Sequence, residues 1–167
     1  MIKVIDGFCP IIDEVKERIK AITYRDVMFE GVMYPDLCLT HEQWAHDKLS
    51  EAMGGKVIPV FEYYRRYMNG RVQPSFIHSD GAICRWNALW SPKDNNGSFR
   101  VWKPITDNPD GLDHNAWELI EEVELKENRC VIYEAATPHS RWPVDWTGEQ
   151  PRIVLVFFFN VRPNKEG

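Results

Sequence analysis

Three residues of the chain have the types and the placement needed to bind one metal ion. His78 and Asp80 stand two positions apart in the segment His78-Ser79-Asp80. Residues i and i+2 of a β-strand project to the same side, so a strand ending here would aim an imidazole and a carboxylate at one point. His139, in the segment ATPHSRWP, stands at the start of a later predicted strand and offers a third ligand.

The chemistry of this ligand set points to iron. Two histidines and one carboxylate on one face of an octahedral ion leave three positions open, as in non-haem Fe(II) oxygenases. A bidentate 2-oxo acid would fill two of them and O2 the third. The far carboxylate of 2-oxoglutarate would then need a cation, and Arg152 opens the last strongly apolar strand. A guanidinium binds a carboxylate through two parallel hydrogen bonds, which a lysine does less well.

Each of these residues also has a simpler interpretation. Either histidine alone would fit a packed core residue. Asp80 precedes Gly81 and would fit a turn, and Arg152 would fit an exposed cation at a strand edge.

The other three histidines are interpreted without a metal. His41 and His46 lie five positions apart in a predicted helix, whereas a metal-binding pair on a helix prefers a spacing of four. We therefore expect both to be solvated or packing residues. His114 lies in the long irregular stretch 104–118 and is expected at the surface, or in a lid over the pocket.

The elements that must position these residues change in character near residue 57. Apolar residues recur at helical spacing over 11–22, and a second helix is expected from an N-cap at Thr40 to a stop at Gly54. Short β-branched and aromatic runs separated by turn residues then predict strands. These runs are 57–68, 73–77, 82–90, 98–103, 120–125, 129–135, 140–144 and 152–159.

This order of elements predicts a mainly β fold with flanking helices. About eight short strands after an N-terminal helical layer favour a double-stranded β-helix, a cupin-like jelly roll of two sheets. The 167 residues are expected to form a single domain, with 1–56 as mostly helical support and 57–160 as the β-helix core.

Four segments resemble a known family: YYRRYMNGRVQPSFIHSD, ICRWNALWSPKDNNGSFRVWKP, KENRCVIYEAATPHSRWPV and PRIVLVFFFN. They are similar to the 2-oxoglutarate- and Fe(II)-dependent dioxygenases, in particular the prolyl-hydroxylase-like branch. The resemblance implies oxidative decarboxylation of 2-oxoglutarate to succinate and hydroxylation of a C–H bond. It also implies that the hydroxyl of Tyr67 reaches the cosubstrate, although Tyr63 and Tyr64 crowd the same segment. The chain departs from the family's usual pattern at Asn96, where a glycine is common, and at Val154, where Ser or Thr is common.

Composition limits the partners. The net charge of −5, from 25 acidic and 20 basic side chains, disfavours a nucleic-acid substrate, because phosphate binding needs a basic surface. The four cysteines form no CxxC pair and fit buried residues in a reducing, cytoplasmic compartment. The N-terminus lacks the pattern of a signal peptide, and the run 153–159 is too short to span a membrane.

Two classes of function remain after these exclusions. The first is an enzyme that hydroxylates a prolyl or other peptidyl side chain, or a small molecule. The second is a cupin-like metal- or ligand-binding module without oxygenase turnover. Decarboxylation of 2-oxoglutarate would separate them.

Overall fold

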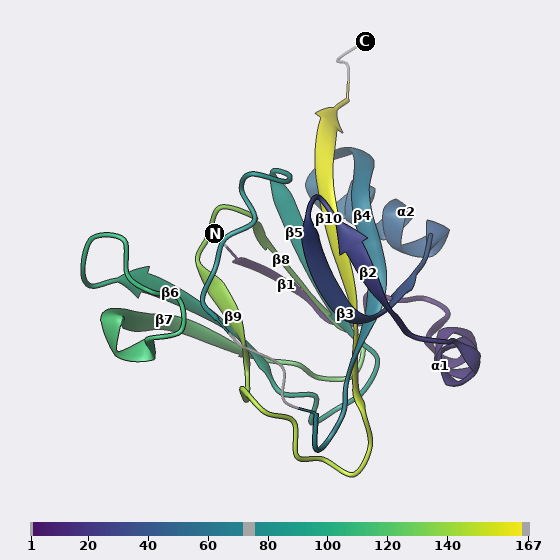
Figure 1. Cartoon of the computed structure of the whole chain (residues 1–167). Helices are drawn as coiled ribbons and strands as arrows, with labels where there is room; N and C mark the ends of the chain where they lie inside the picture. The colour runs from purple at the N-terminus through teal and green to yellow at the C-terminus, as the bar shows by residue number, and fades with distance from the viewer. Residues whose placement is uncertain (1, 72–75, 165–167) are drawn as a thin grey trace.

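The computed structural model describes residues 2–71 and 76–164 and is built around two antiparallel sheets (Figure 1). The larger sheet has the order β1-β8-β5-β10-β4-β3-β2, and the smaller has the order β7-β6-β9. The strands are β1 (Ile2–Ile5), β2 (Arg25–Phe29), β3 (Val32–Leu39), β4 (Gly55–Tyr67), β5 (Trp86–Ser91), β6 (Ser98–Pro104), β7 (Trp117–Glu124), β8 (Arg129–Glu134), β9 (His139–Trp142) and β10 (Arg152–Pro163). The helices are α1 (Ile12–Ala21), α2 (Gln43–Met53) and the short 3-10 helix η1 (His114–Ala116).

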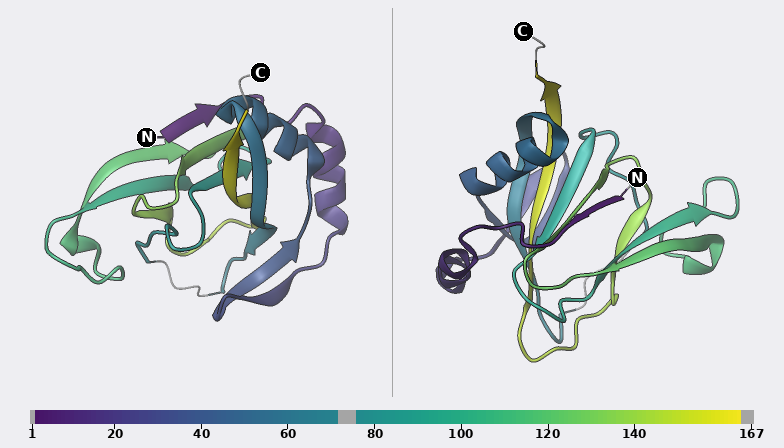
Figure 2. Two further views of the ribbon diagram at one scale, coloured as in Figure 1. Left: turned by 90° about the horizontal axis from the view of Figure 1, so that it is seen from above. Right: turned by 180° about the vertical axis from the view of Figure 1, so that it is seen from behind.

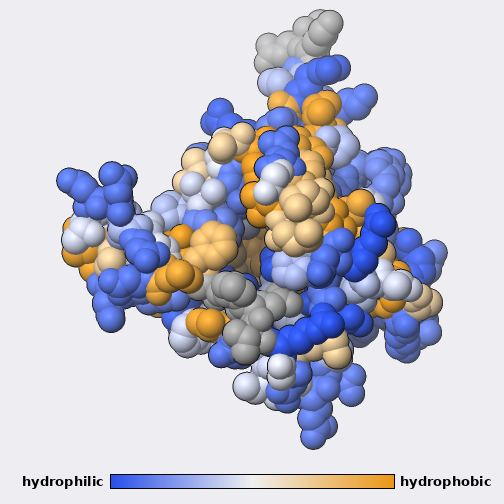
Figure 3. Space-filling view, viewed as in Figure 1, coloured by the Kyte–Doolittle hydropathy of each residue, from blue (hydrophilic) through white to orange (hydrophobic). Residues whose placement is uncertain are grey.

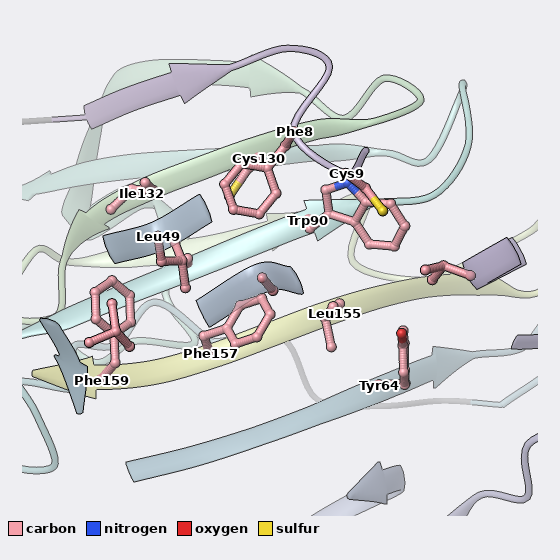
Figure 4. Close-up of a cluster of buried hydrophobic side chains, with 14 of the residues drawn as sticks. Phe8, Cys9, Leu49, Tyr64, Trp90, Cys130, Ile132, Leu155, Phe157 and Phe159 are labelled. Atoms are coloured by element: carbon pink, nitrogen blue, oxygen red, sulfur yellow. The ribbon is translucent and has the colours of Figure 1, made fainter. Parts of the chain in front are cut away.

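The central strand β10 explains why the sequence 153–159 is apolar without interruption. Alternate side chains of a strand point to opposite faces of the sheet. Leu155, Phe157 and Phe159 join the core beneath the helices (Figure 4), whereas Val154 and Phe158 line the cavity on the other face. Both faces of β10 are therefore covered, and a covered strand needs apolar residues at every position.

The two α-helices cover one face of the large sheet, and the small sheet lies toward the other (Figure 2). Val15 and Ile19 are the buried residues of α1, and its acidic and basic side chains face outward. Leu49 of α2 packs into the same core. Gly54 ends α2 in the left-handed conformation, with φ of 67°, as the sequence predicted.

The N-terminal third corrects one expectation. Residues 1–56 were expected to be mostly helical, but they also supply β1, β2 and β3. β2 and β3 form a hairpin whose turn residues, Glu30 and Gly31, both have positive φ, of 49° and 76°. Two central residues with positive φ match the right-handed twist of the paired strands. Residues 25–39 therefore supply one edge of the large sheet.

The start of the second helix also differs from the prediction. The helix begins at Gln43 with Glu42 at its N-cap position, rather than with Thr40. The backbone N–H of Thr40 instead donates to the carbonyl of Glu62 at 3.3 Å. Thr40 therefore continues the pairing of β3 with β4, which delays the helix.

The predicted strands from residue 57 onward are confirmed, with shifted bounds, except in two places. Most of the run 73–77 lies outside the described residues. Residues 82–85 precede the strand instead of belonging to it, because a turn at 81–83 is closed by the N–H of Ile83, which donates to the carbonyl of Asp80 at 2.9 Å. All four cysteines are free. Within 2–71 and 76–164, no helix is both long and apolar enough to cross a membrane.

Candidate metal centre and anion pocket

The backbone brings the three expected metal ligands together. His78 and His139 form an isolated antiparallel bridge, with N–H to carbonyl distances of 3.1 and 2.9 Å. The N–H of Asp80 donates to the carbonyl of Ala135 at 2.6 Å. These contacts fix both strand ends, and the two imidazole centroids lie 4.5 Å apart.

The side chains are oriented so that their ligand atoms converge. Nδ1 of His78 bonds the carbonyl of Phe76 at 3.0 Å, and Nδ1 of His139 bonds that of Thr137 at 2.8 Å. Nε2 is left to face Asp80 in both histidines, at 3.6 Å for His78 and 3.2 Å for His139. Two ligands about 2.1 Å from one ion lie about 3 to 3.5 Å apart at octahedral to tetrahedral angles. The donor set and its spacing therefore fit a divalent transition metal.

The charges of the site also fit a cation. Burial raises the pKa of Asp80, but its contacts with His139, His78 and Asn87 outweigh burial and hold the pKa below its usual value. The amide of Asn87 donates to Asp80 Oδ2 at 2.7 Å. Burial and the neighbouring His139 lower the pKa of His78. A carboxylate and a neutral imidazole are the protonation states that a metal requires.

The loop that follows β6 supports this centre. The carbonyl of Gly111 accepts the N–H of Ile77 at 2.8 Å, next to His78. A Cβ at Gly111 would lie 2.3 Å from the Ile77 carbonyl oxygen, so a glycine is needed for the two chains to approach. The stretch 104–118 therefore positions the His78 segment through its backbone.

A cavity of about 360 Å³ connects the three ligands to a basic cluster. Its walls come from both sheets, and most of its lining is apolar. Arg152 lies in this lining and is 2% exposed, and its Nε donates to the carbonyl of Asn96 at 2.8 Å. Gly97, with φ of 76°, passes close to Arg152 and to the Trp142 carbonyl, where a Cβ would clash.

Tyr67 and Arg152 lie side by side, and both line the cavity. They are direct partners in the β4–β10 register, and the Arg152 guanidinium lies 5.0 Å from the Tyr67 ring centroid. Burial lowers the pKa of Arg152 to about 10, so the side chain remains charged at neutral pH. Tyr63 also lines the cavity, whereas Tyr64 packs in the core beneath the helices.

Sequence reasoning missed two further arginines of this cluster. Arg65 lies 5.0 Å and Arg141 lies 4.8 Å from the Tyr67 ring centroid, and both line the cavity. A signal for them was present, because Arg65 precedes Tyr67 by two positions and Arg141 follows His139 by two. Three guanidinium groups around one cavity end create a positive potential there, which favours an anion.

Tyr67 should be the first of the six tyrosines to ionise as the pH is raised. Burial raises its pKa, but the three guanidinium groups lower it further, to below the usual value. Burial raises the pKa of the other five, which are Tyr24, Tyr34, Tyr63, Tyr64 and Tyr133. An alkaline titration followed by phenolate absorbance should lose its earliest transition in Tyr67→Phe. An unchanged first transition in that variant would show that the basic cluster does not act on Tyr67.

Solved structures with the same fold are known. HygX from Streptomyces hygroscopicus, with nickel, 2-oxoglutarate and hygromycin B bound, is 13% identical with a TM-score of 0.65, covering 95% of this chain and 82% of that one. An oxidoreductase of the 2OG-Fe(II) oxygenase family from Burkholderia pseudomallei is 11% identical with a TM-score of 0.55, covering 98% and 88%. The epimerase SnoN, in complex with Fe3+, alpha ketoglutarate and nogalamycin RO, is 12% identical with a TM-score of 0.58, covering 95% and 78%.

These likenesses establish the fold. The chain has the cupin-like double-sheet fold of 2-oxoglutarate and Fe(II) enzymes, as predicted from its sequence. No protein-family model matches the chain, and no curated protein matches it either. Membership of the prolyl-hydroxylase-like branch stays a prediction.

Proposed function

We propose that the chain is a one-domain Fe(II)- and 2-oxoglutarate-dependent oxygenase. The observation that carries the proposal is that one cavity contains both a two-histidine, one-carboxylate cluster and a cluster of three arginines, of which Arg152 is buried. A metal-binding module without a cosubstrate has no need of the second cluster. The fold likeness to enzymes solved with a metal and 2-oxoglutarate supports the same function.

The metal ligands in this proposal are His78, Asp80 and His139. Their ligand atoms all lie within 4.8 Å of one another, and the backbone carbonyls bonded to both Nδ1 atoms hold the imidazoles in place. Such partners fix the tautomer of a metal-binding histidine. Bound iron, with 2-oxoglutarate and O2, would supply the oxidising power for decarboxylation to succinate and oxidation of a C–H bond.

The arginine cluster would bind the far carboxylate of 2-oxoglutarate. Arg152 is fixed by Asn96 and offers its remaining donors from a buried position, where a charge-assisted hydrogen bond is strong. Tyr67 adds a hydroxyl beside it, and Arg65 and Arg141 add positive charge. Ser98 also lines this cavity.

The substrate would enter past an apolar rim. Val32 and Met33 of β3 and Phe76 before His78 all line the cavity and are 54%, 53% and 47% exposed. Figure 3 shows apolar surface over β2 and β3 beside a hollow in this face. Exposed apolar side chains at a pocket mark a binding surface. We propose an apolar substrate group here, on a prolyl or other peptidyl side chain or on a small molecule.

The test is production of succinate from 2-oxoglutarate by the purified protein with Fe(II) and O2. Slow turnover in the absence of substrate is expected, because the metal and cosubstrate sites are complete without it. His139→Ala should reduce succinate to background. Metal binding without any succinate formation would instead favour a cupin-like binding module.

A further inference from the structure

A second group of potential metal ligands lies outside the cavity. It comprises His41, before α2, His46 in α2 and Glu62 in β4. Their ligand atoms all lie within 4.8 Å of one another, and the two imidazole centroids are 4.3 Å apart. The helix begins only at Gln43, so the five-residue spacing that argued against a helical pair does not apply to His41.

This group lies on the opposite face of β4 from the candidate iron site. Tyr63 and Arg65 line the cavity. Glu62 and Tyr64 alternate with them and point to the face covered by α2, where Tyr64 enters the core and Glu62 meets His46. The sheet therefore separates the two groups, and an ion at one would not touch the other.

Glu62 is a buried carboxylate with one oxygen that lacks a hydrogen-bond partner among the described residues. Its side chain is 5% exposed, and Oε1 lies 2.5 Å from Nε2 of His46. Oε2 is buried and has no hydrogen-bond partner among the described residues. Glu42, the neighbouring buried carboxylate, differs because it accepts bonds from Arg18, Trp44, Tyr64 and Thr40. An unpaired buried carboxylate oxygen is destabilising, and a bound cation would satisfy it.

We propose that His41, His46 and Glu62 bind a divalent transition-metal ion such as Zn2+. Two imidazoles and a carboxylate are a common zinc donor set, and water can complete the coordination. His41 is exposed, and its side chain contacts Gln43 at 3.3 Å, so it can reorient at the solvent side of the site. His46 and Glu62 would separate to about 3 Å as the ion takes the place of the hydrogen between them.

The proposed site would join α2 to β4. His46 belongs to the helix and Glu62 to the strand, and the helix packs directly on that strand. A metal bound across two elements stabilises the folded state, because the unfolded chain lacks the preformed site. Zn2+ should therefore raise the melting temperature even when the cavity can bind no metal.

The test uses a parent variant in which His78→Ala and His139→Ala remove the cavity ligands. Equilibrium dialysis with Zn2+ alone should give one ion per chain in this parent and two in the unaltered protein. His41→Ala in this parent should weaken Zn2+ affinity by at least about tenfold. Tenfold is the smallest loss that is typical when a residue that hydrogen-bonds to a metal ligand is removed. His114→Ala, which changes a histidine outside both groups, should leave it unchanged.

His41→Ala is the primary variant because His41 is exposed, whereas replacing His46 would leave Glu62 buried and unpaired. Thermal unfolding with and without Zn2+ gives a second measurement. The melting temperature of the parent should rise with Zn2+, and that of the His41→Ala variant should rise much less. The proposal would be overturned if the parent variant binds no Zn2+, or if His41→Ala leaves its Zn2+ affinity unchanged. In either case His46 and Glu62 would form a buried hydrogen bond and no metal site with His41.

Discussion

Asp80→Ala is expected to abolish iron binding in the cavity and reduce succinate formation by more than about a hundredfold. Losing a residue that only hydrogen-bonds to a metal ligand typically reduces activity by up to about a hundredfold. Losing a ligand itself should reduce activity by more. Asp80 is the one negative charge among the three ligands, and Nε2 of His139 lies 3.2 Å from it. Without it, two imidazoles would remain to hold a dication.

The fold must be monitored in this experiment. Asp80 accepts a hydrogen bond from the side-chain amide of Asn87, which is fully buried. Asp80→Ala would leave that donor without a partner, which should lower the free energy of unfolding by about 1 to 3 kcal/mol. Asp80→Asn retains the shape and an acceptor while removing the charge, and it should lose iron binding with less loss of stability. His114→Ala is the matched control and should bind iron normally. Full succinate formation by folded Asp80→Asn would contradict the assignment.

Arg152→Ala is expected to weaken 2-oxoglutarate binding by about 30-fold or more while iron binding is retained. Loss of one partner of a buried charged pair typically costs about 2 to 5 kcal/mol, which sets that scale. Arg152 lies at the Tyr67 end of the cavity and does not contact the three metal ligands. Anaerobic titration with 2-oxoglutarate in the presence of Fe(II) measures the dissociation constant directly.

Two further variants isolate the cause of that loss. Arg152→Lys preserves a positive charge but not the planar fork, so its affinity should fall between that of the unaltered protein and that of Arg152→Ala. Arg85→Ala removes an exposed arginine that does not line the cavity, and it should bind 2-oxoglutarate normally. Equal affinities of Arg152→Ala and the unaltered protein would place the cosubstrate elsewhere.

The β-rich part of the fold could be predicted because its strands have clear patterns. Both faces of β10 are covered, so its apolar run was unambiguous, and Arg152 at its start lies in the cavity lining. His78 and His139 were brought together by a backbone bridge between segments that are distant in sequence. Their residue types predicted a shared metal site, whereas their distances come only from the structure.

The other parts of the fold and of the site depend on tertiary contacts, which local sequence patterns do not predict. The β2–β3 hairpin was missed because Pro35 interrupts its second strand and its outer residues are exposed, so the segment gave no clear alternation. Arg65 and Arg141 come together beside Tyr67 only because β4 and β9 face the same cavity. The pairing of His46 with Glu62 likewise arises from the packing of α2 on β4, which helix spacing alone does not reveal.

The most direct test of the central claim is an anaerobic titration of the protein with Fe(II) and then 2-oxoglutarate, followed by visible absorbance. A metal-to-ligand charge-transfer band should appear only after both are added, since it requires 2-oxoglutarate bound to the iron. The band should be absent in His139→Ala and should need more 2-oxoglutarate in Arg152→Ala. Iron binding without any such band in the unaltered protein would contradict the account and favour a metal-binding module without oxygenase turnover.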